Sequence, residues 1–220
     1  TNGVMLQTPQ SGAYSTFYSE NFGGATVAAG GTMSGSANLL NYPGQLQVFD
    51  NVTNQVGGLT VAAGVNASAY MVDFDLITST GADGISYSFG DDVNANAITP
   101  TQEKGSGSKL KISFDAYGAA MPNAQGIYLL YNNTAGSFNN TTPGVLAYSN
   151  DISWVNDTSH VSISIDNAGK LSLAVGATTI FNGVQLPAAY LAANKATWSH
   201  VISGRTGAIT MLATIDNLLI

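Results

Sequence analysis

The sequence predicts an all-β protein, an antiparallel β-sandwich of two sheets with jelly-roll connections. Three observations predict it: short segments in which apolar and polar residues alternate, turn residues between these segments, and a scarcity of the charged residues that cover helix surfaces. Only 9% of the 220 residues are charged, against roughly 25% in an ordinary soluble domain. Glycine, serine, threonine and asparagine take their place, and these residues favour strands and turns over helices.

The alternation is clearest at 69–77, where every second residue is apolar and Asp73 and Asp75 share the other face. The same period predicts strands at 85–89, 110–114, 127–131, 161–165, 171–175 and 209–219. The similar stretches 25–30 and 59–64 are also expected to be strands. The segments 161–165 and 171–175 form a hairpin around Asn167 and Gly169. Pro187 suits the first turn of a helix, so 186–193 is expected to form one short helix.

Charge and composition exclude several classes of protein. Thirteen acidic residues against six basic ones, a net charge of −7 and a pI near 4.3 offer nothing to a nucleic acid or to an anionic membrane surface. No apolar run approaches the ~18 residues that insertion into a membrane requires. No break in composition divides the chain, so we expect residues 1–220 to form a single domain. The composition and the N-terminal Thr1-Asn2-Gly3 predict a segment of a larger secreted or cell-surface protein.

A series of motifs follows in order from about residue 80. It comprises Gly81–Phe89, Leu110–Tyr117, Gly126–Leu130, the hairpin 161–175, Leu186-Pro187 with Val201–Gly207, and a closing strand at Thr214–Leu218. The series resembles the L-type lectin family, whose concanavalin A-like jelly roll is shared by legume lectins and by bacterial secreted and surface modules. Residues 1–79 carry no diagnostic motif and would supply the first strands. The resemblance implies that the partner is a glycan or polysaccharide.

The resemblance also implies a sugar site. Asp83 takes the place of the sugar-binding carboxylate, which accepts two hydrogen bonds from adjacent hydroxyls, and Gly84 leaves room for the ring. An Asp-Gly pair is equally typical of a turn before a strand, so a purely structural role for Asp83 and Gly84 remains an alternative. Gly105 or Gly107 would present a backbone N–H to the sugar, unless they only form a hairpin connection. The loop that begins at Ala208 corresponds to the part that varies with sugar choice.

Two further residues belong to the implied site, and both are also implied in a metal site. Tyr117 would stack on a sugar ring and Asn123 would contribute its side-chain amide. The Asp115 carboxylate, the Tyr117 carbonyl and Asn123 would together bind calcium, although one carboxylate makes a weak site for an ion that takes 6–8 oxygens. In the alternative, Asp115 is structural and orders the 117–125 loop through backbone N–H groups. Ser113 stands where the family has a glutamate ligand, so no transition metal is expected.

Catalysis is not expected. Glycan hydrolysis needs two carboxylates flanking the scissile bond, and the only glutamates, Glu20 and Glu103, lie outside any E-x-D-x-x-E strand motif. No G-x-S-x-G nucleophile motif occurs either. The sequence therefore predicts a non-catalytic carbohydrate-binding module. The alternatives are a structural or adhesive module of the same fold without a sugar site and, third, a polysaccharide-cleaving enzyme.

Overall fold

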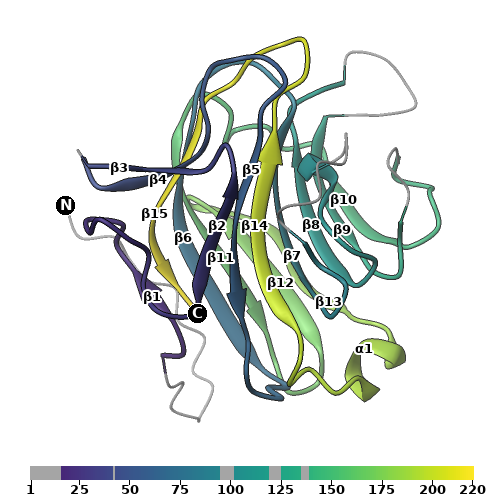
Figure 1. The fold of residues 1–220 in the computed structure, drawn as a ribbon. Helices are drawn as coiled ribbons and strands as arrows, with labels where there is room; N and C mark the ends of the chain where they lie inside the picture. Colours follow the sequence, from purple (N-terminus) through teal and green to yellow (C-terminus); the bar gives the residue numbers. More distant parts are fainter. Residues whose placement is uncertain (1–15, 42, 95–101, 119–124, 135–138) are drawn as a thin grey trace.

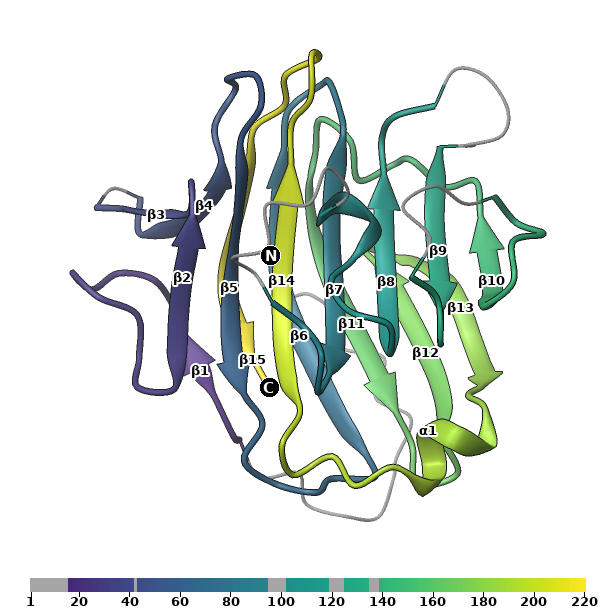
Figure 2. The same cartoon turned by 45° about the vertical axis from the view of Figure 1, so that its right-hand side comes forward.

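Two antiparallel sheets stack face to face and form a β-sandwich (Figures 1 and 2). The computed structural model describes residues 16–41, 43–94, 102–118, 125–134 and 139–220. Within these residues two short helical segments accompany the sheets: the 3₁₀ helix η1 (Gln102–Lys104) and the α-helix α1 (Ala188–Ala192). No helix in these described ranges is long and apolar enough to cross a membrane.

The chain passes from one sheet to the other several times, and some runs of consecutive strands lie within the same sheet. In spatial order the first sheet contains β13 (Thr178–Gln185), β12 (Lys170–Val175), β11 (Thr158–Ile165), β6 (Tyr70–Thr78), β15 (Ala213–Leu219), β4 (Gln45–Phe49) and β3 (Asn38–Leu40), with β1 (Ser19–Glu20) paired to β15. The second sheet contains β10 (Val145–Ser149), β9 (Gly126–Leu130), β8 (Leu110–Asp115), β7 (Gly84–Gly90), β14 (Ser199–Arg205), β5 (Val56–Ala62) and β2 (Gly31–Gly35).

One hydrophobic core lies between the sheets and is built from the inward-facing residues of each strand. Phe74 of β6 and Ile112 of β8 are examples, each at most 1% exposed. Trp154 and Trp198 are buried in the same core, where their large aromatic rings pack against other apolar side chains. Burial of this continuous apolar layer is the main force that holds the sheets together.

The segments predicted as strands are confirmed at most positions. Strands β6, β7, β8, β9, β11 and β12 cover them, β11 and β12 form the predicted hairpin, and α1 is the predicted helical turn. The prediction for 209–219 was wrong in its first part, because the strand begins only at Ala213. Residues before it contact the loop after β6, where the Leu212 N–H donates to the Ser79 hydroxyl oxygen (2.9 Å).

The strand predicted at 25–30 was also wrong. This segment is irregular, and the Ala28 N–H donates to the Glu20 carboxylate and not to a strand neighbour. The similar segment at 59–64 does form a strand, since Leu59–Ala62 belongs to β5 and pairs with both β2 and β14. The two segments are therefore similar in sequence but differ in structural role.

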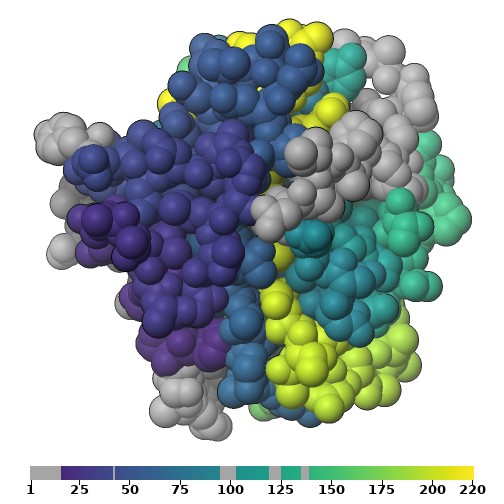
Figure 3. All heavy atoms as spheres, in the orientation of Figure 1, coloured from purple at the N-terminus to yellow at the C-terminus, as the bar shows by residue number. Residues whose placement is uncertain are grey.

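The outer face of the second sheet is covered at its centre. Every residue of β7 and β8 is buried, including the polar residues that point away from the core. Helix η1 contacts β7, β8 and β14 there, and the Ser113 hydroxyl donates to the Glu103 carbonyl oxygen (2.7 Å). Figure 3 shows the teal segment that includes η1 on this face, with β14 visible beside it as a narrow yellow strip. The polar residues of β7 and β8 are therefore buried, although their alternation is that of a half-exposed strand.

We expect Ile112→Ala to lower the free energy of unfolding by about 2–5 kcal/mol, because the truncation leaves a cavity in the core. Ile209→Ala is the matched control, since Ile209 is 51% exposed. Urea unfolding monitored by tryptophan fluorescence measures both changes. Equal effects of the two substitutions would contradict the placement of β8 in the core.

Candidate functional site

Three neighbouring strands in the middle of the second sheet have ends that lie side by side, at one end of the sheet. Strand β7 pairs with β8 on one side and with β14 on the other, and this register places Gly84 opposite both Asp115 and Arg205. Asp83 immediately precedes Gly84, and its peptide bond with Ala82 is cis. The Asp83 backbone bridges the same neighbours: its carbonyl oxygen accepts from the Ala116 N–H (2.8 Å) and its N–H donates to the Arg205 carbonyl oxygen (3.3 Å). The pairing of the strands thus brings together residues far apart in sequence.

Two glycines allow close approach around Asp83. Gly84 has a positive φ of 154°, and a Cβ at this position would overlap the Phe114 carbonyl group. Gly207 lies in the loop after β14, where a Cβ would sit 2.9 Å from the Asp83 carboxylate oxygen Oδ2. Glycine is therefore needed at position 84, and at position 207 it lets the loop lie directly against the Asp83 carboxylate.

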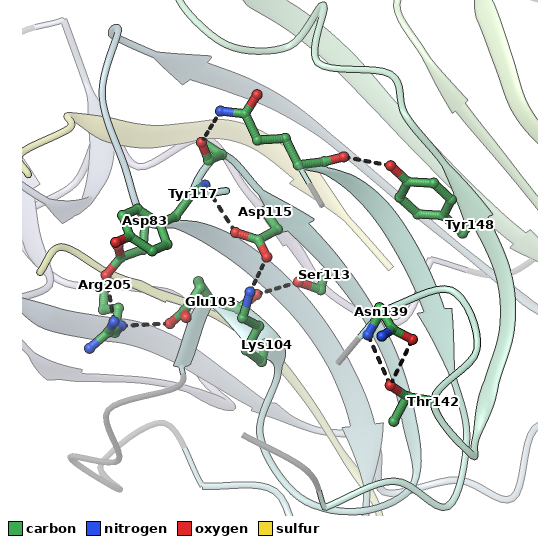
Figure 4. Close-up of polar contacts among 12 residues, drawn as sticks. Asp83, Glu103, Lys104, Ser113, Asp115, Tyr117, Asn139, Thr142, Tyr148 and Arg205 are labelled. Carbon is green, nitrogen blue, oxygen red and sulfur yellow. Dashed lines mark hydrogen bonds and ion pairs between the residues drawn. The ribbon is translucent and has the colours of Figure 1, made fainter. Parts of the chain in front are cut away.

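A network of five charged side chains fills this end of the sheet (Figure 4). Arg205 contacts two carboxylates, with Nη2 at 2.7 Å from Asp83 Oδ2 and Nε at 2.7 Å from Glu103 Oε2. Lys104 forms an ion pair with Asp115. The side chains of the three acids and of Lys104 are each at most 5% exposed, and that of Arg205 is 23% exposed. Charges this buried are stable only when they are paired.

Burial also raises the pKa of all three carboxyl groups. For Glu103 the pKa rises from 4.5 to about 7 because of burial, although Arg205 and Lys104 favour the ionised form. Burial raises the pKa of Asp83 against the opposing effect of Arg205, and it raises the pKa of Asp115 against that of Lys104. The two cations keep these shifts smaller than burial alone would make them.

Tyr117 projects from the strand end beside this network. Its backbone N–H donates to Asp115 Oδ1 (3.0 Å), so the Asp115 carboxylate orients the start of the loop after β8. Its side chain is 51% exposed. An exposed aromatic ring two residues from a buried aspartate is available to a ligand, whereas Tyr87, Tyr128, Trp154 and Trp198 are buried.

The structure brings together only some of the residues implied in the sugar site. Asp83 and Gly84 lie at the meeting of the strand ends, with Tyr117 near Asp115 and Ala208 exposed in the loop after Gly207. Gly105 and Gly107 lie elsewhere. Gly105 contacts the side chain of Lys111, which pairs with Ser88 of β7, and Gly107 contacts Asp92 beyond the far end of β7. Asn123 lies outside the described residues.

Glu103, Lys104 and Arg205 belong to this site although no sequence motif indicated a role for them in it. Glu103 and Lys104 reach the site because η1 lies over β7, β8 and β14, and Arg205 reaches it through the pairing of β14 with β7. One feature of the sequence could have pointed to the two cations. The chain has only six basic residues, so a lysine or arginine close to a strand motif is uncommon. Such a residue suggests an ion pair with a buried acid, but the sequence does not show which acid is the partner.

The groups that contact Asp115 determine whether the implied calcium ion could bind there. Calcium takes 6–8 oxygen ligands. Asp115 Oδ2 is in contact with the Lys104 ammonium group and Oδ1 accepts from the Tyr117 N–H, while the neighbouring Ser113 hydroxyl donates to Glu103. Across the described part of the chain, no group of three or more histidine, aspartate or glutamate side chains is arranged to hold a metal ion. The described donors do not fit calcium while Lys104 keeps this position.

No protein-family profile and no curated protein matches this sequence. Solved structures do match. The metal-free exoplasmic/lumenal domain of VIP36 aligns over 93% of this chain and 90% of its own, with a TM-score of 0.66 and 14% identity. Lectin II from Ulex europaeus aligns over 87% and 92%, with a TM-score of 0.64 and 16% identity. The carbohydrate recognition domain of Emp47p aligns over 92% and 93%, with a TM-score of 0.62 and 13% identity.

The chain has an L-type lectin-like fold. The alignments extend over most of each chain, so the lectin-like fold includes the early strands β1 to β6 for which the sequence offered no motif. Calcium is known in this fold, since VIP36 has also been solved in a Ca²⁺-bound form. At identities of 13–16% the likeness concerns the fold, and the chemistry of the site depends on this chain's own residues.

The raised pKa of Glu103 predicts a pH dependence of stability. The folded chain binds this proton more tightly than the unfolded chain, because the pKa is about 7 in one and 4.5 in the other. The stabilisation is therefore complete below pH 4.5 and is lost as the pH rises through 7. We expect wild type to lose up to about 3 kcal/mol more stability than Glu103→Gln over this range, measured by urea unfolding.

Asp91→Asn is the control for this measurement, because the Asp91 side chain is 50% exposed. It should follow the pH profile of wild type. A Glu103→Gln profile parallel to that of wild type would show that the Glu103 carboxyl does not titrate in this range.

Proposed function

We propose that this chain is a non-catalytic carbohydrate-binding module and that it recognises a glycan at the end of the second sheet where Asp83 lies. One observation carries the proposal: a buried, charge-fixed aspartate lies beside an exposed aromatic side chain and an exposed loop of small residues. These three features come from Asp83, Tyr117 and the Gly207–Ala208 loop. Sugar sites combine such elements, because hydroxyl groups need a strong acceptor and the C–H face of the ring needs an apolar partner.

Each residue has a distinct role in the proposed site. Arg205 holds Oδ2 of Asp83 and so fixes the carboxylate, while a sugar hydroxyl donates to Oδ1. Gly207 has no side chain to block the approach over Asp83. The ring of Tyr117 stacks on the sugar, and Ala208 contacts its edge. Gly105 and Gly107 have no role, because they contact Lys111 and Asp92 and not Asp83.

The absence of catalysis is part of the proposal. A glycan hydrolase needs two carboxylates on either side of the scissile bond with room for the substrate between them. Here Asp83 and Glu103 both contact Arg205, which occupies the space between them, and each side chain is at most 5% exposed. Their geometry supports binding and not bond cleavage.

The similar structures support a neutral glycan as the partner. VIP36 has been solved with Man and with Man₃GlcNAc, and the Ulex lectin with galactose. A surface with few charges suits neutral sugars, and six basic residues in the whole chain leave little to attract a sulfated or phosphorylated one. VIP36 is described as an exoplasmic/lumenal domain, which supports a secreted or cell-surface location for the larger protein that we propose contains this module.

A second candidate is a structural or adhesive module of the same fold. The burial of Asp83 favours it, since a carboxylate that is 5% exposed and paired with Arg205 has a structural role whether or not it binds sugar. The two candidates differ in whether any glycan is bound at all.

We expect binding to an array of mannose- and galactose-terminated glycans, followed by titration calorimetry on the best glycan. Asp83→Asn should weaken binding by about 10- to 100-fold, because the sugar hydroxyl then donates to a neutral amide and not to a charged carboxylate. Tyr117→Ala should weaken it by about 5- to 10-fold through loss of the stacking surface.

Asp75→Asn is the matched control on the opposite sheet, where Asp75 contacts His160 and Asn217. It should bind glycans like wild type. The melting temperature of each variant identifies any loss of fold. Binding that is indifferent to Asp83 and Tyr117 in folded variants would overturn the proposed site, and a wild-type chain that binds no glycan would favour the structural module.

A further inference from the structure

Lys104 is an unusual residue for its position. It is a lysine in a short 3₁₀ helix, yet it is only 4% exposed and its ammonium group contacts the carboxylate of Asp115. Its long side chain runs from η1 to the end of β8 (Figure 4). A buried lysine loses hydration and rotamer freedom, so this arrangement is stable only if the ammonium group is held by compensating charges.

The surroundings supply these charges. Asp115 is in direct contact with Lys104, and the electrostatic influence of Lys104 also reaches Asp83 and Glu103. Three acids and two bases thus share one buried cluster, whose net charge is −1 when all are ionised. Without Lys104 the cluster would carry two uncompensated negative charges.

The ammonium group also organises the loop that carries Tyr117. Lys104 holds Oδ2 of Asp115, and this leaves Oδ1 to accept from the Tyr117 N–H (3.0 Å). The Ala116 N–H in turn donates to the Asp83 carbonyl oxygen (2.8 Å). One cation therefore fixes the aspartate that orients both the loop and the backbone of Asp83.

We infer that the Lys104 ammonium group acts at Asp115 as a covalently tethered cation in place of a divalent metal ion, so that this site forms and stays formed without calcium. A divalent ion at the same carboxylate would have to displace the ammonium group and overcome its repulsion. A tethered cation is not removed by dilution or by a chelator. The inference rests on the proposed function only in that both concern the same site, and the test below needs no glycan.

The first experiment is thermal unfolding of the wild-type chain in millimolar CaCl₂ and in EDTA. The melting temperature should differ by less than about 1 °C, whereas an ion present at a hundred times its dissociation constant would raise it by several degrees. Asp115→Asn is measured under the same conditions. A calcium-dependent rise in wild type that is lost in Asp115→Asn would overturn the inference.

The second experiment is a double-mutant cycle on Lys104→Met and Asp115→Asn. Breaking a buried pair should lower the melting temperature by about 10 °C in each single variant, and the double variant should lose much less than the sum. Lys170→Met, at an exposed lysine, is the control and should change it by less than about 2 °C. Additive losses would overturn the pairing. If a single variant does not fold, the calcium experiment on wild type still decides the question.

A chain that passes both tests but binds no glycan would retain this inference and lose the proposed function. A chain that binds glycan only in calcium, through Asp115, would lose the inference and retain the function. The two failures are therefore distinguishable.

Discussion

Mutual neutralisation of buried charges is the constraint on which the site depends. Asp83, Glu103 and Asp115 are withdrawn from water at one end of the second sheet, and this is tolerated because Arg205 and Lys104 lie between them. Burial also raises the pKa of Glu103 to about 7 against the opposing effect of Arg205 and Lys104, and protonation of that one carboxyl makes the cluster neutral. The structure at this end of the sheet, its charge state and the orientation of the loop that carries Tyr117 are thus coupled through one network.

The cluster exists because the outer face of the second sheet is lined by small polar side chains. Ser86, Ser113 and Ser203 face outward on β7, β8 and β14, and each is at most 1% exposed. Small residues let the backbone of η1 lie close to the sheet, where the Ser113 hydroxyl donates to the Glu103 carbonyl oxygen. This contact positions Glu103 and Lys104 to reach the strand ends. Larger residues on this face would lift η1 and separate the charges.

The scarcity of charge in the sequence has a clearer meaning in the folded chain. Of the six basic residues, Lys104, Lys111 and Lys195 are buried, so the surface is even less basic than the composition suggests. Lys195 lies over the ring of Tyr190, with its ammonium nitrogen 4.4 Å from the ring centre. The exposed surface depends largely on amides, hydroxyls and backbone groups for its hydration, and such a surface suits neutral ligands.

The sequence by itself determined the fold class and most strands, because alternation with period two is a local property that burial on one face imposes. It also identified Asp83 and Asp115 as the two acids of interest, and it held open the structural role of Asp115 as an acceptor for the loop N–H groups. It placed strands wrongly at 25–30 and at 209–212, where contacts with distant segments override local preference. Only the tertiary structure decided which residues meet. Gly84 lies opposite Asp115 and Arg205 through pairing of β7 with β8 and β14, and Lys104 reaches Asp115 through the docking of η1. Those contacts depend on register and on helix placement, which are non-local and are not encoded in the spacing of residues along the chain.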